Sequence, residues 1–282
     1  MIPLIAAAHL ALLPMAAPAA LASLKSQGPM RVEAYYETQL PALVGRSKTA
    51  SATLVADIGP GAYAVRATAK AEGMSGWFGG YALDIQSNGS VTEVGAVPRR
   101  YEATNKDGRR NRRLLVDYLP AEVRVLALPA FGDFGHPPAA PAQRLEGMDP
   151  LSAFVNLSIG AGATADNPCG APIRVFDGKQ RYDVKLTFAG RLAYKSPAYK
   201  GPAIKCAAEY VEIAGFREKD ARQRAKEAAD IEWANIILAD LPGELHPPIK
   251  LEARTKRKGK LTLQAVKLVY GPAPPSTTVA KR

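Results

Sequence analysis

The sequence predicts a mainly β protein, because short segments of alternating apolar and polar residues follow one another from Arg31 onward, separated by turn residues. Residues 63–70 alternate in this way, which places Tyr63, Val65 and Ala67 on one face of a strand. Residues 49–56 form a similar run, and Gly59-Pro60-Gly61 supplies the turn between the two runs. These segments are therefore expected to pair as neighbouring strands.

Dipeptides that tolerate positive φ mark the expected hairpins. Asn88-Gly89 and Asp107-Gly108 are predicted hairpin turns, and Asp177-Gly178 is predicted to join strands at 173–176 and 181–188. Near the end of the chain, residues 249–255 and 260–270 flank a turn at Lys258-Gly259. The apolar residues of 260–270 do not alternate strictly, so a small register irregularity is expected near Val266.

Helical signals are sparse. Asp149 is a predicted N-cap, Pro150 fits the first helical position, and residues 151–157 carry an apolar face. Residues 218–229 are rich in Ala, Glu, Lys and Arg and form either a helix or an extended, solvated edge. The proline-rich residues 134–144 cannot pair inside a sheet. They are interpreted as a long loop within one extended sheet, with a domain boundary as the alternative.

The N-terminus has the features of a secretory signal. No charged side chain precedes Lys25, and an apolar run broken by Pro14 and Pro18 ends in Ala20-Leu21-Ala22. A signal peptide is predicted over residues 1–22, with cleavage near Ala22. The alternative is a retained membrane anchor, which needs about 20 strongly apolar residues, whereas this run is rich in Ala and broken by prolines. A single β domain over 31–270 and a disordered tail over 271–282 are expected to follow.

Charge and cysteine content suit an exported protein. The formal net charge of +11 favours anionic neighbours, and export makes nucleic acid the poorest of these. Cys169 and Cys206 are the only two cysteines, and in an oxidising compartment an isolated pair is most simply a disulfide. The alternative, a metal or redox pair, requires a CxxC-type spacing or histidines nearby, and neither is present.

Catalytic patterns are weak. His136 and His246 are the histidines beyond the signal, and both precede Pro-Pro pairs, so both are predicted to be turn or surface residues. No nucleophile elbow, phosphate loop or zinc helix motif occurs. The carboxylates of Asp177, Asp183, Glu209 and Glu212 are better explained as turn and strand-surface groups than as a glycosidase pair. The sequence therefore predicts a protein that is not an enzyme and has no metal or cofactor.

Two groups of residues are candidates for contacts with a ligand or a surface. Arg109, Arg110, Arg112 and Arg113 surround one predicted hairpin turn, and residues 254–260 form a second basic run. Such clusters contact anionic groups or simply keep solvated hairpin tips from pairing with other chains. Trp77, Phe78 and Tyr81 lie among glycines and are candidate ligand or membrane contacts, with core packing as the alternative.

A family resemblance is carried by Asp149-Pro150-Leu151-Ser152-Ala153, by the later run at 175–183 (VFDGKQRYD), and by Cys169 and Cys206. On these motifs the chain resembles the exported bacterial proteins known as domain of unknown function 3108, from about residue 35 to residue 270. The resemblance implies one large, strongly curved antiparallel sheet, a half-barrel or β-spiral similar to periplasmic lipoprotein-carrier folds, with one or two short helices. It assigns no catalytic residue.

The expected function combines these features. The chain is expected to be a non-enzymatic protein of the Gram-negative periplasm whose curved sheet binds a lipid, a lipidated protein or another envelope component. The alternative is a scaffold that contacts peptidoglycan, anionic lipid or an envelope complex through its basic hairpin tips. Peripheral contact with an anionic membrane is compatible with both hypotheses, and a hydrolase is the least favoured.

Overall fold

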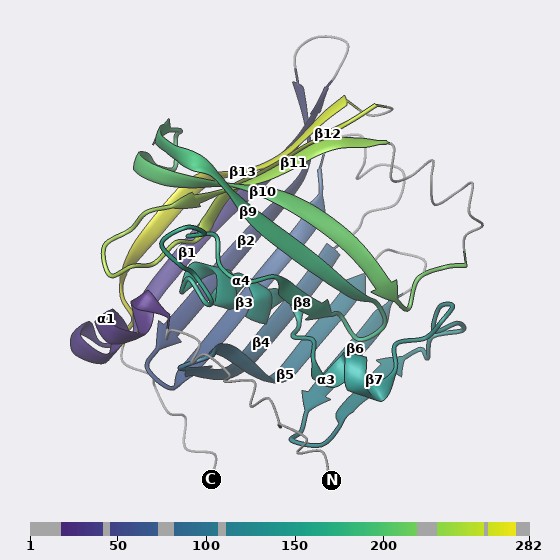
Figure 1. The fold of residues 1–282 in the computed structure, drawn as a ribbon. Coiled ribbons are helices and arrows are strands. Elements are labelled where there is room, and N and C mark those ends of the chain that lie inside the picture. Colours follow the sequence, from purple (N-terminus) through teal and green to yellow (C-terminus); the bar gives the residue numbers. More distant parts are fainter. Residues whose placement is uncertain are drawn as a thin grey trace, which may run out of the picture.

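The fold is one curved antiparallel sheet with a helix inside it. The computed structural model describes residues 18–41, 46–72, 82–106, 111–218, 230–256 and 259–274. These residues form a sheet of 13 strands, not closed into a barrel, and three helices (Figure 1). The helices are α1 (Ala19–Gln27), α3 (Pro141–Leu145) and α4 (Pro150–Ser158). The strands are β1 (Met30–Pro41), β2 (Arg46–Gly59), β3 (Ala62–Ala71), β4 (Ala82–Thr92), β5 (Gly95–Lys106), β6 (Arg112–Tyr118), β7 (Val123–Leu128), β8 (Ile173–Phe176), β9 (Arg181–Lys195), β10 (Lys200–Ala214), β11 (Ile231–Ala239), β12 (Pro248–Thr255) and β13 (Gly259–Pro272). The predicted mainly β fold class is confirmed.

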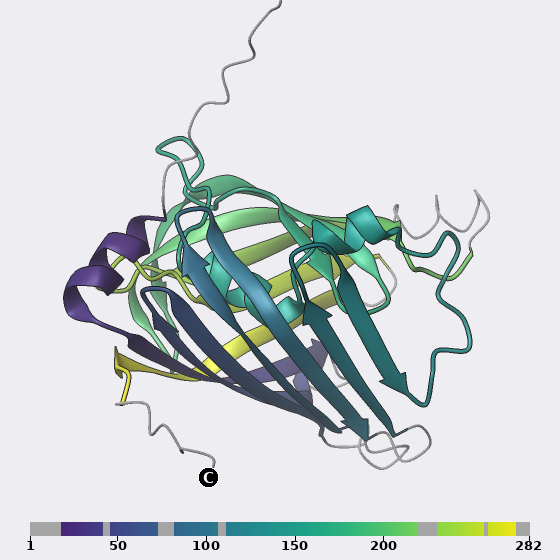
Figure 2. The same cartoon turned by 90° about the horizontal axis from the view of Figure 1, so that it is seen from below.

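The sheet has a simple meander topology with one long-range pairing. Its strand order is β7-β6-β5-β4-β3-β2-β1-β13-β12-β11-β10-β9-β8, so every pair of adjacent strands consists of sequence neighbours except the pair of β1 with β13. Figures 1 and 2 show the sheet curving round so that β9 and β10 face β3, β4 and β5, with α4 between them. This is the strongly curved sheet that the family resemblance implies.

The two faces of the sheet are set by alternation along the strands. On β3, Tyr63, Val65 and Ala67 are buried, and the residues between them are exposed. The Tyr63 hydroxyl lies 2.6 Å from the Ser152 hydroxyl of α4, so the buried face is the one that α4 covers. We call this the inner face and its opposite the outer face. The predicted common face of Tyr63, Val65 and Ala67 is confirmed.

The gap between the two end strands is bridged by loops. Met148 pairs with Val175 and covers the free edge of β8. The Tyr118 hydroxyl of β6 donates to the Phe176 carbonyl at 3.0 Å. Gly178, at φ +98°, sits so close to β6 that a Cβ there would lie 2.8 Å from the Leu114 side chain. The glycine of the Asp177-Gly178 turn is thus required both for the turn and for this approach.

Two of the predicted hairpins have instructive outcomes. The turn at Asp177-Gly178 between β8 and β9 is confirmed, with the Asp177 carboxylate accepting from the Lys179 and Gln180 amides. The turn at Asn88-Gly89 is wrong: both residues lie inside β4, and the chain reverses between Thr92 and Gly95. Gly89 serves another purpose there, because a Cβ on it would overlap the Val97 carbonyl and the Tyr63 ring. Asp107-Gly108 lies outside the described residues, although the strands that flank it do pair.

The C-terminal hairpin agrees with its prediction. β12 and β13 pair, and β13 is irregular opposite β1, where Tyr35 faces Lys267 and Tyr36 faces Ala265. Val266 is therefore the extra residue of a bulge, as expected from the broken alternation. β13 continues to Pro272, so the first two residues of the predicted tail belong to the sheet, and residues 275–282 are not described.

The predicted helix after Asp149 is confirmed as α4. The Asp149 carboxylate accepts from the amides of Leu151 and Ser152, which is the expected N-cap arrangement. The proline-rich segment is irregular up to Ala140, and its last residues begin α3. Its backbone pairs with the end of β10, where Gly215 donates to the Pro137 carbonyl. The segment 218–229, predicted to be either a helix or an extended edge, falls almost entirely outside the described residues.

Helix α1 spans the expected signal cleavage position. Ala20, Leu21 and Leu24 are buried in the main core cluster, and Lys25 pairs with Glu93 at 2.8 Å. Cleavage after Ala22 would remove the first two of these contacts and leave Leu24 in place. The cleavage site stays a prediction, and the burial of Ala20 and Leu21 defines what processing at that position would change. No helix in the described ranges is long and apolar enough to span a membrane.

Candidate functional site

One half of the inner face is filled by α4 and the loop that follows it. Val155 and Ile159 pack with Ile58 and Val65 of the sheet in the main core cluster. A second cluster, which includes Leu157 and Leu186, packs beneath β8 to β11. We call this part of the inner face the filled half.

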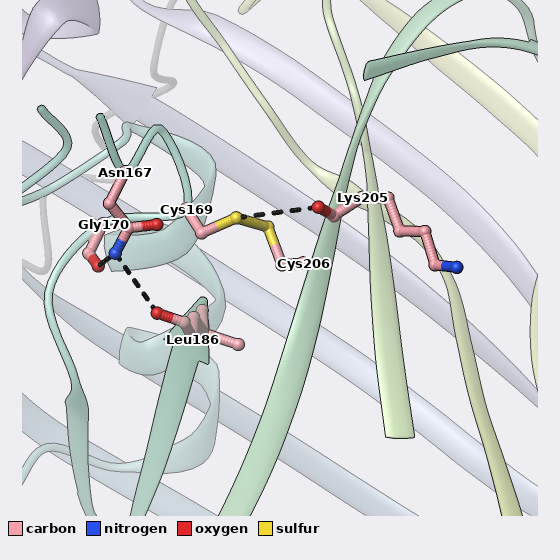
Figure 3. Close-up of a disulfide and its surroundings, with 6 residues drawn as sticks. All are labelled: Asn167, Cys169, Gly170, Leu186, Lys205 and Cys206. Carbon is pink, nitrogen blue, oxygen red and sulfur yellow. Dashed lines mark hydrogen bonds between the residues drawn. A yellow bond between two sulfur atoms is a disulfide. The ribbon is translucent and has the colours of Figure 1, made fainter. Parts of the chain in front are cut away.

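A disulfide fixes this loop to the sheet. Cys169 on the loop is bonded to Cys206 on β10, with the Cα atoms 5.9 Å apart, and both residues are buried (Figure 3). The Asn167 side chain adds hydrogen bonds to the carbonyls of Gly170 and Leu186. The predicted disulfide is present in the structure.

A buried polar cluster connects the start of α4 to the sheet. The Ser87 hydroxyl of β4 donates to the Asp149 carboxylate at 2.9 Å, and the Ser152 hydroxyl donates to the same carboxylate oxygen. Burial raises the pKa of Asp149 above its ordinary value, and burial likewise raises the pKa of Tyr63, whose hydroxyl contacts Ser152. All four side chains are buried, so the cluster holds α4 in place and does not meet solvent.

Sequence reasoning missed this cluster, although one signal for it exists. Along β4 the inner positions run Leu83, Ile85, Ser87, Gly89 and Val91, so a serine interrupts an otherwise apolar row. A serine at an inner position needs a buried partner, and Asp149 is that partner.

The rest of the inner face forms an apolar groove of about 330 Å³ beside the filled half. Its inner-face side chains come from β9 to β13 and β1: Val184, Ala208, Tyr210, Ala234, Ile236, Leu251, Ala253, Leu261, Leu263 and Thr38. The strand register places Cys206, Ile236, Leu251, Leu263 and Thr38 in one row across the sheet. The groove therefore begins where the disulfide-linked cluster ends.

Small apolar residues continue this surface across β2 to β4. The row of Thr38 reaches Ala50 on β2 and Ala71 on β3, and the next row, that of Tyr36, reaches Ala52, Ala69 and Leu83. These five apolar residues are only partly buried. Alanine side chains project little from the sheet and leave the inner face accessible there. We call the apolar groove and these residues together the open half.

A polar pocket of about 400 Å³ lies at the far side of the open half. Asn105 of β5 and Arg112 of β6 line one wall, and Asp177, Lys179 and Gln180 of the β8–β9 turn line the other. Phe131 lies between the two cations, 4.6 Å from the Arg112 guanidinium and 6.0 Å from the Lys179 ammonium. Burial raises the pKa of Asp177, whose carboxylate is engaged by the turn amides.

The structure separates the arginines that the sequence grouped together. Arg112 shares the parity of Leu114 and Val116 and lies on the inner face, whereas Arg113 lies on the outer face, 3.7 Å from Glu102. Arg109 and Arg110 lie outside the described residues. Trp77, Phe78 and Tyr81 also lie outside them, so their predicted contacts stay predictions.

The remaining polar candidates differ in their surroundings. His136 is exposed in the loop before α3, and His246 is mostly buried, with its amide donating to the Ser158 carbonyl. Asp183 pairs with the buried Arg181, and Glu209 pairs with Lys185 on an exposed strand surface. Within the described residues, no group of three or more His, Cys, Asp or Glu side chains is arranged to hold a metal ion.

Grooves also occur on the outer face, but their chemistry differs. One of them, about 430 Å³, is flanked by Tyr35, Lys70, Asp84 and Lys106. The Tyr35 hydroxyl accepts from Lys48 at 3.1 Å, and hydrogen bonds from Ser51 and Lys48 lower the pKa of Tyr35. Several of the side chains around this groove are polar or charged and are already engaged, as Ser51 and Lys70 are with Glu72. The open half is the better candidate for a ligand site.

Comparisons with known proteins identify a family and a likeness of fold. Residues 33–264 match the family described as "Protein of unknown function (DUF3108)". No curated protein matches the sequence. Among solved structures, the chain is similar to a β-barrel-like protein of the DUF1849 family from Brucella abortus, at 10% identity and a TM-score of 0.45, covering 86% of this chain and 99% of that one. A DUF1329 family protein from Desulfovibrio piger is similar at 8% identity and a TM-score of 0.19, covering 90% of this chain and 88% of that one. On the family match, the chain belongs to the DUF3108 family of proteins of unknown function.

Proposed function

We propose that the protein is a non-enzymatic component of the bacterial envelope that binds the acyl chain of a lipid or lipidated protein in the apolar groove. The observation that carries this proposal is the groove itself, about 330 Å³, whose inner-face side chains are leucine, isoleucine, valine and alanine together with Tyr210 and Thr38. This volume lies within the usual range of about 300 to 1,000 Å³ for ligand pockets.

The exposure of apolar side chains in the groove supports a bound apolar ligand. Leu251 is 37% exposed and Tyr210 is 48% exposed, although both belong to the inner face of a curved sheet. Contact between water and such an apolar surface is unfavourable in free energy. Each Å² of apolar area that a ligand covers contributes about 25 cal/mol to the free energy of binding. An acyl chain is a suitable occupant because it makes no hydrogen bonds and follows a groove without directional demands.

The placement of reactive side chains supports a binding role over catalysis. The Ser87, Ser152 and Asp149 cluster is sealed beneath α4, and the carboxylates on the β8–β9 hairpin are engaged in a turn or an ion pair. A hydrolytic site would require a nucleophile and a base exposed together to substrate. The two carboxylates that line the apolar groove, Glu209 and Glu252, are each paired with a lysine.

Export to the periplasm is part of the proposal. The disulfide between Cys169 and Cys206 is compatible with an oxidising compartment, where such bonds persist. The apolar N-terminal run is the expected secretion signal. Intact mass of the protein purified from the periplasmic fraction would report both the oxidation state of the cysteines and the cleavage site near Ala22.

Native mass spectrometry of periplasm-purified protein tests acyl-chain binding directly. Wild-type protein is expected to carry lipid mass, and the double variant Leu251→Glu, Leu263→Glu is expected to lose it because two charges would enter the groove. Leu126→Glu is the matched control, since Leu126 is an exposed leucine on the outer face of β7. Absence of bound lipid in the wild type, or equal retention in all three proteins, would contradict the proposal.

A further inference from the structure

The polar pocket and the apolar groove lie at successive positions along β9, and no residue lines both. Gln180, just before β9, lines the pocket, and Val184 lines the groove. Val184 is four positions after Gln180, which in extended chain is roughly 13 Å. The cross-sheet row Ala69, Leu83, Asn105 and Arg112 connects the polar pocket to the small apolar residues of β3 and β4. A single ligand of modest length can therefore reach both sites.

Arg112 is held in position but keeps hydrogen-bonding capacity. Its Nε donates to the Pro129 carbonyl at 3.2 Å, and its guanidinium lies over the Phe131 ring. In the part of the chain that the structure describes, the guanidinium has no carboxylate partner, unlike Arg113 with Glu102. A guanidinium fixed by an aromatic ring and one backbone bond is well suited to an anionic oxygen group.

Lys179 and Asn105 complete the chemistry of the pocket. The Lys179 ammonium faces the same ring, with the exposed Asp133 carboxylate 3.8 Å away. The Asn105 Oδ1 is buried and has no hydrogen-bond donor among the described residues. Buried acceptors are normally satisfied, so this oxygen calls for a donor such as a hydroxyl or N–H.

We propose that the polar pocket binds the head of an anionic amphiphile whose acyl chain lies in the apolar groove. Arg112 and Lys179 contact its phosphate or carboxylate, and Asn105 accepts from a hydroxyl next to that group. This assignment rests on the proposed function, because it takes the acyl chain to occupy the groove. It adds the ligand class: a single molecule with an anionic, hydroxyl-bearing head.

Two lipids that differ only in the phosphate test the assignment. Delipidated protein is titrated with myristoyl lysophosphatidic acid and with monomyristoylglycerol, and glycerol phosphate alone serves as the head without a chain. Wild-type protein is expected to bind the phosphorylated lipid about 10-fold or more tightly than the neutral one, since hydrogen bonds to charged groups are the strong ones. Glycerol phosphate is expected to bind far more weakly than either lipid.

Adjacent arginines supply a matched pair of variants. Arg112→Gln is expected to reduce the affinity for the phosphorylated lipid to that for the neutral lipid, whereas Arg113→Gln, with the same charge change on the outer face, leaves both unchanged. Lys179→Gln changes the opposite wall of the pocket and is expected to lower the affinity for the phosphorylated lipid only. If Arg112→Gln destabilises the loop around Pro129, which thermal unfolding would show, Lys179→Gln still tests the pocket.

The possible outcomes separate the two proposals. Equal affinity of wild-type protein for both lipids, unaffected by Arg112→Gln and Lys179→Gln, would overturn the head-group assignment and leave acyl binding intact. Glycerol phosphate binding as tightly as the acylated form would also overturn it, because the anion site would then be independent of the groove. Failure of both lipids to bind wild-type protein would overturn the proposed function itself.

Discussion

The filled and open halves of the inner face differ although the same strands build both. On β2, Ala56 is fully buried and Ala52, four residues earlier on the same face, is only partly buried. The difference comes from the segment between β7 and β8, which carries α4 and the disulfide-linked loop and covers only one half. The strands alone thus build a curved surface, and the inserted segment decides which part of it is core and which part is free for a ligand.

The largest difference between the halves is expected on removing the disulfide. The bond closes a loop of 37 residues, and chain-entropy treatment gives a stabilisation of about 4 kcal/mol for a loop of this size. We expect the double variant Cys169→Ser, Cys206→Ser to lose that much unfolding free energy in urea denaturation. Hydrogen exchange should rise first in residues 159–172. Unchanged protection of that loop would show that packing alone holds it.

The next largest difference in stability is expected between truncating a side chain in the filled half and truncating one in the open half. Ile159 is fully buried at the end of α4, so Ile159→Ala is expected to destabilise the protein by about 3 kcal/mol through lost burial and a cavity. Leu251→Ala in the open half removes the same number of carbon atoms from a side chain that is already 37% exposed, and should cost less than about 1 kcal/mol. Equal losses in chemical denaturation of the delipidated proteins would mean that the two halves are packed alike.

Enlarging an alanine sharpens the comparison on a single strand. Ala56→Leu adds volume to the packed half and is expected to cost about 1 to 3 kcal/mol. Ala52→Leu adds the same volume to the open half, so its effect on the unfolding free energy should be small, while lipid affinity falls. Thermal unfolding and lipid titration of the two variants measure both effects. A stability loss for Ala52→Leu as large as that for Ala56→Leu would show that the open half is already full.

The smallest effect concerns pH and the buried polar cluster. Burial raises the pKa of Asp149 above its ordinary value of 3.8, so the folded state binds this proton more tightly than the unfolded state. The contribution of Asp149 to the free energy of unfolding therefore falls as the pH rises from about 4 through its pKa in the folded state. Asp149→Asn keeps an N-cap side chain but does not titrate. The free energy of unfolding of the wild type minus that of Asp149→Asn, measured by urea denaturation, should decrease over that pH range. A constant or rising difference would contradict a raised pKa of Asp149 in the folded state.

Local signals in the sequence predicted the elements whose causes are local. Asp149-Pro150 identified the start of α4, Asp177-Gly178 identified the β8–β9 turn, and the broken alternation near Val266 identified the bulge. The turn predicted at Asn88-Gly89 was wrong because Gly89 is required for another reason. The Tyr63 side chain of the neighbouring strand lies so close that there is no room for a Cβ. Contacts of that kind depend on the register between strands and are not encoded in a dipeptide.

The candidate site was predictable only in part. The apolar groove requires Leu263 to face Thr38, a pairing of residues far apart in the chain that local patterns do not reveal. The inward position of Arg112, in contrast, follows from its parity with Leu114 and Val116. It was obscured because four neighbouring arginines were interpreted as a single hairpin tip. Alternation along a strand is a stronger guide to the face of a charged residue than its distance from a turn.

The central claim, that the open half binds an acyl chain, is tested most directly by photo-crosslinking with a diazirine-bearing palmitic acid followed by tryptic peptide mapping. The account predicts labelling of the peptides 251–254 and 261–267, which carry Leu251 and Leu263. The peptide 125–144, which carries the exposed outer-face leucines of β7, should stay unlabelled. Label confined to that outer-face peptide, or spread evenly over all three, would contradict the claim.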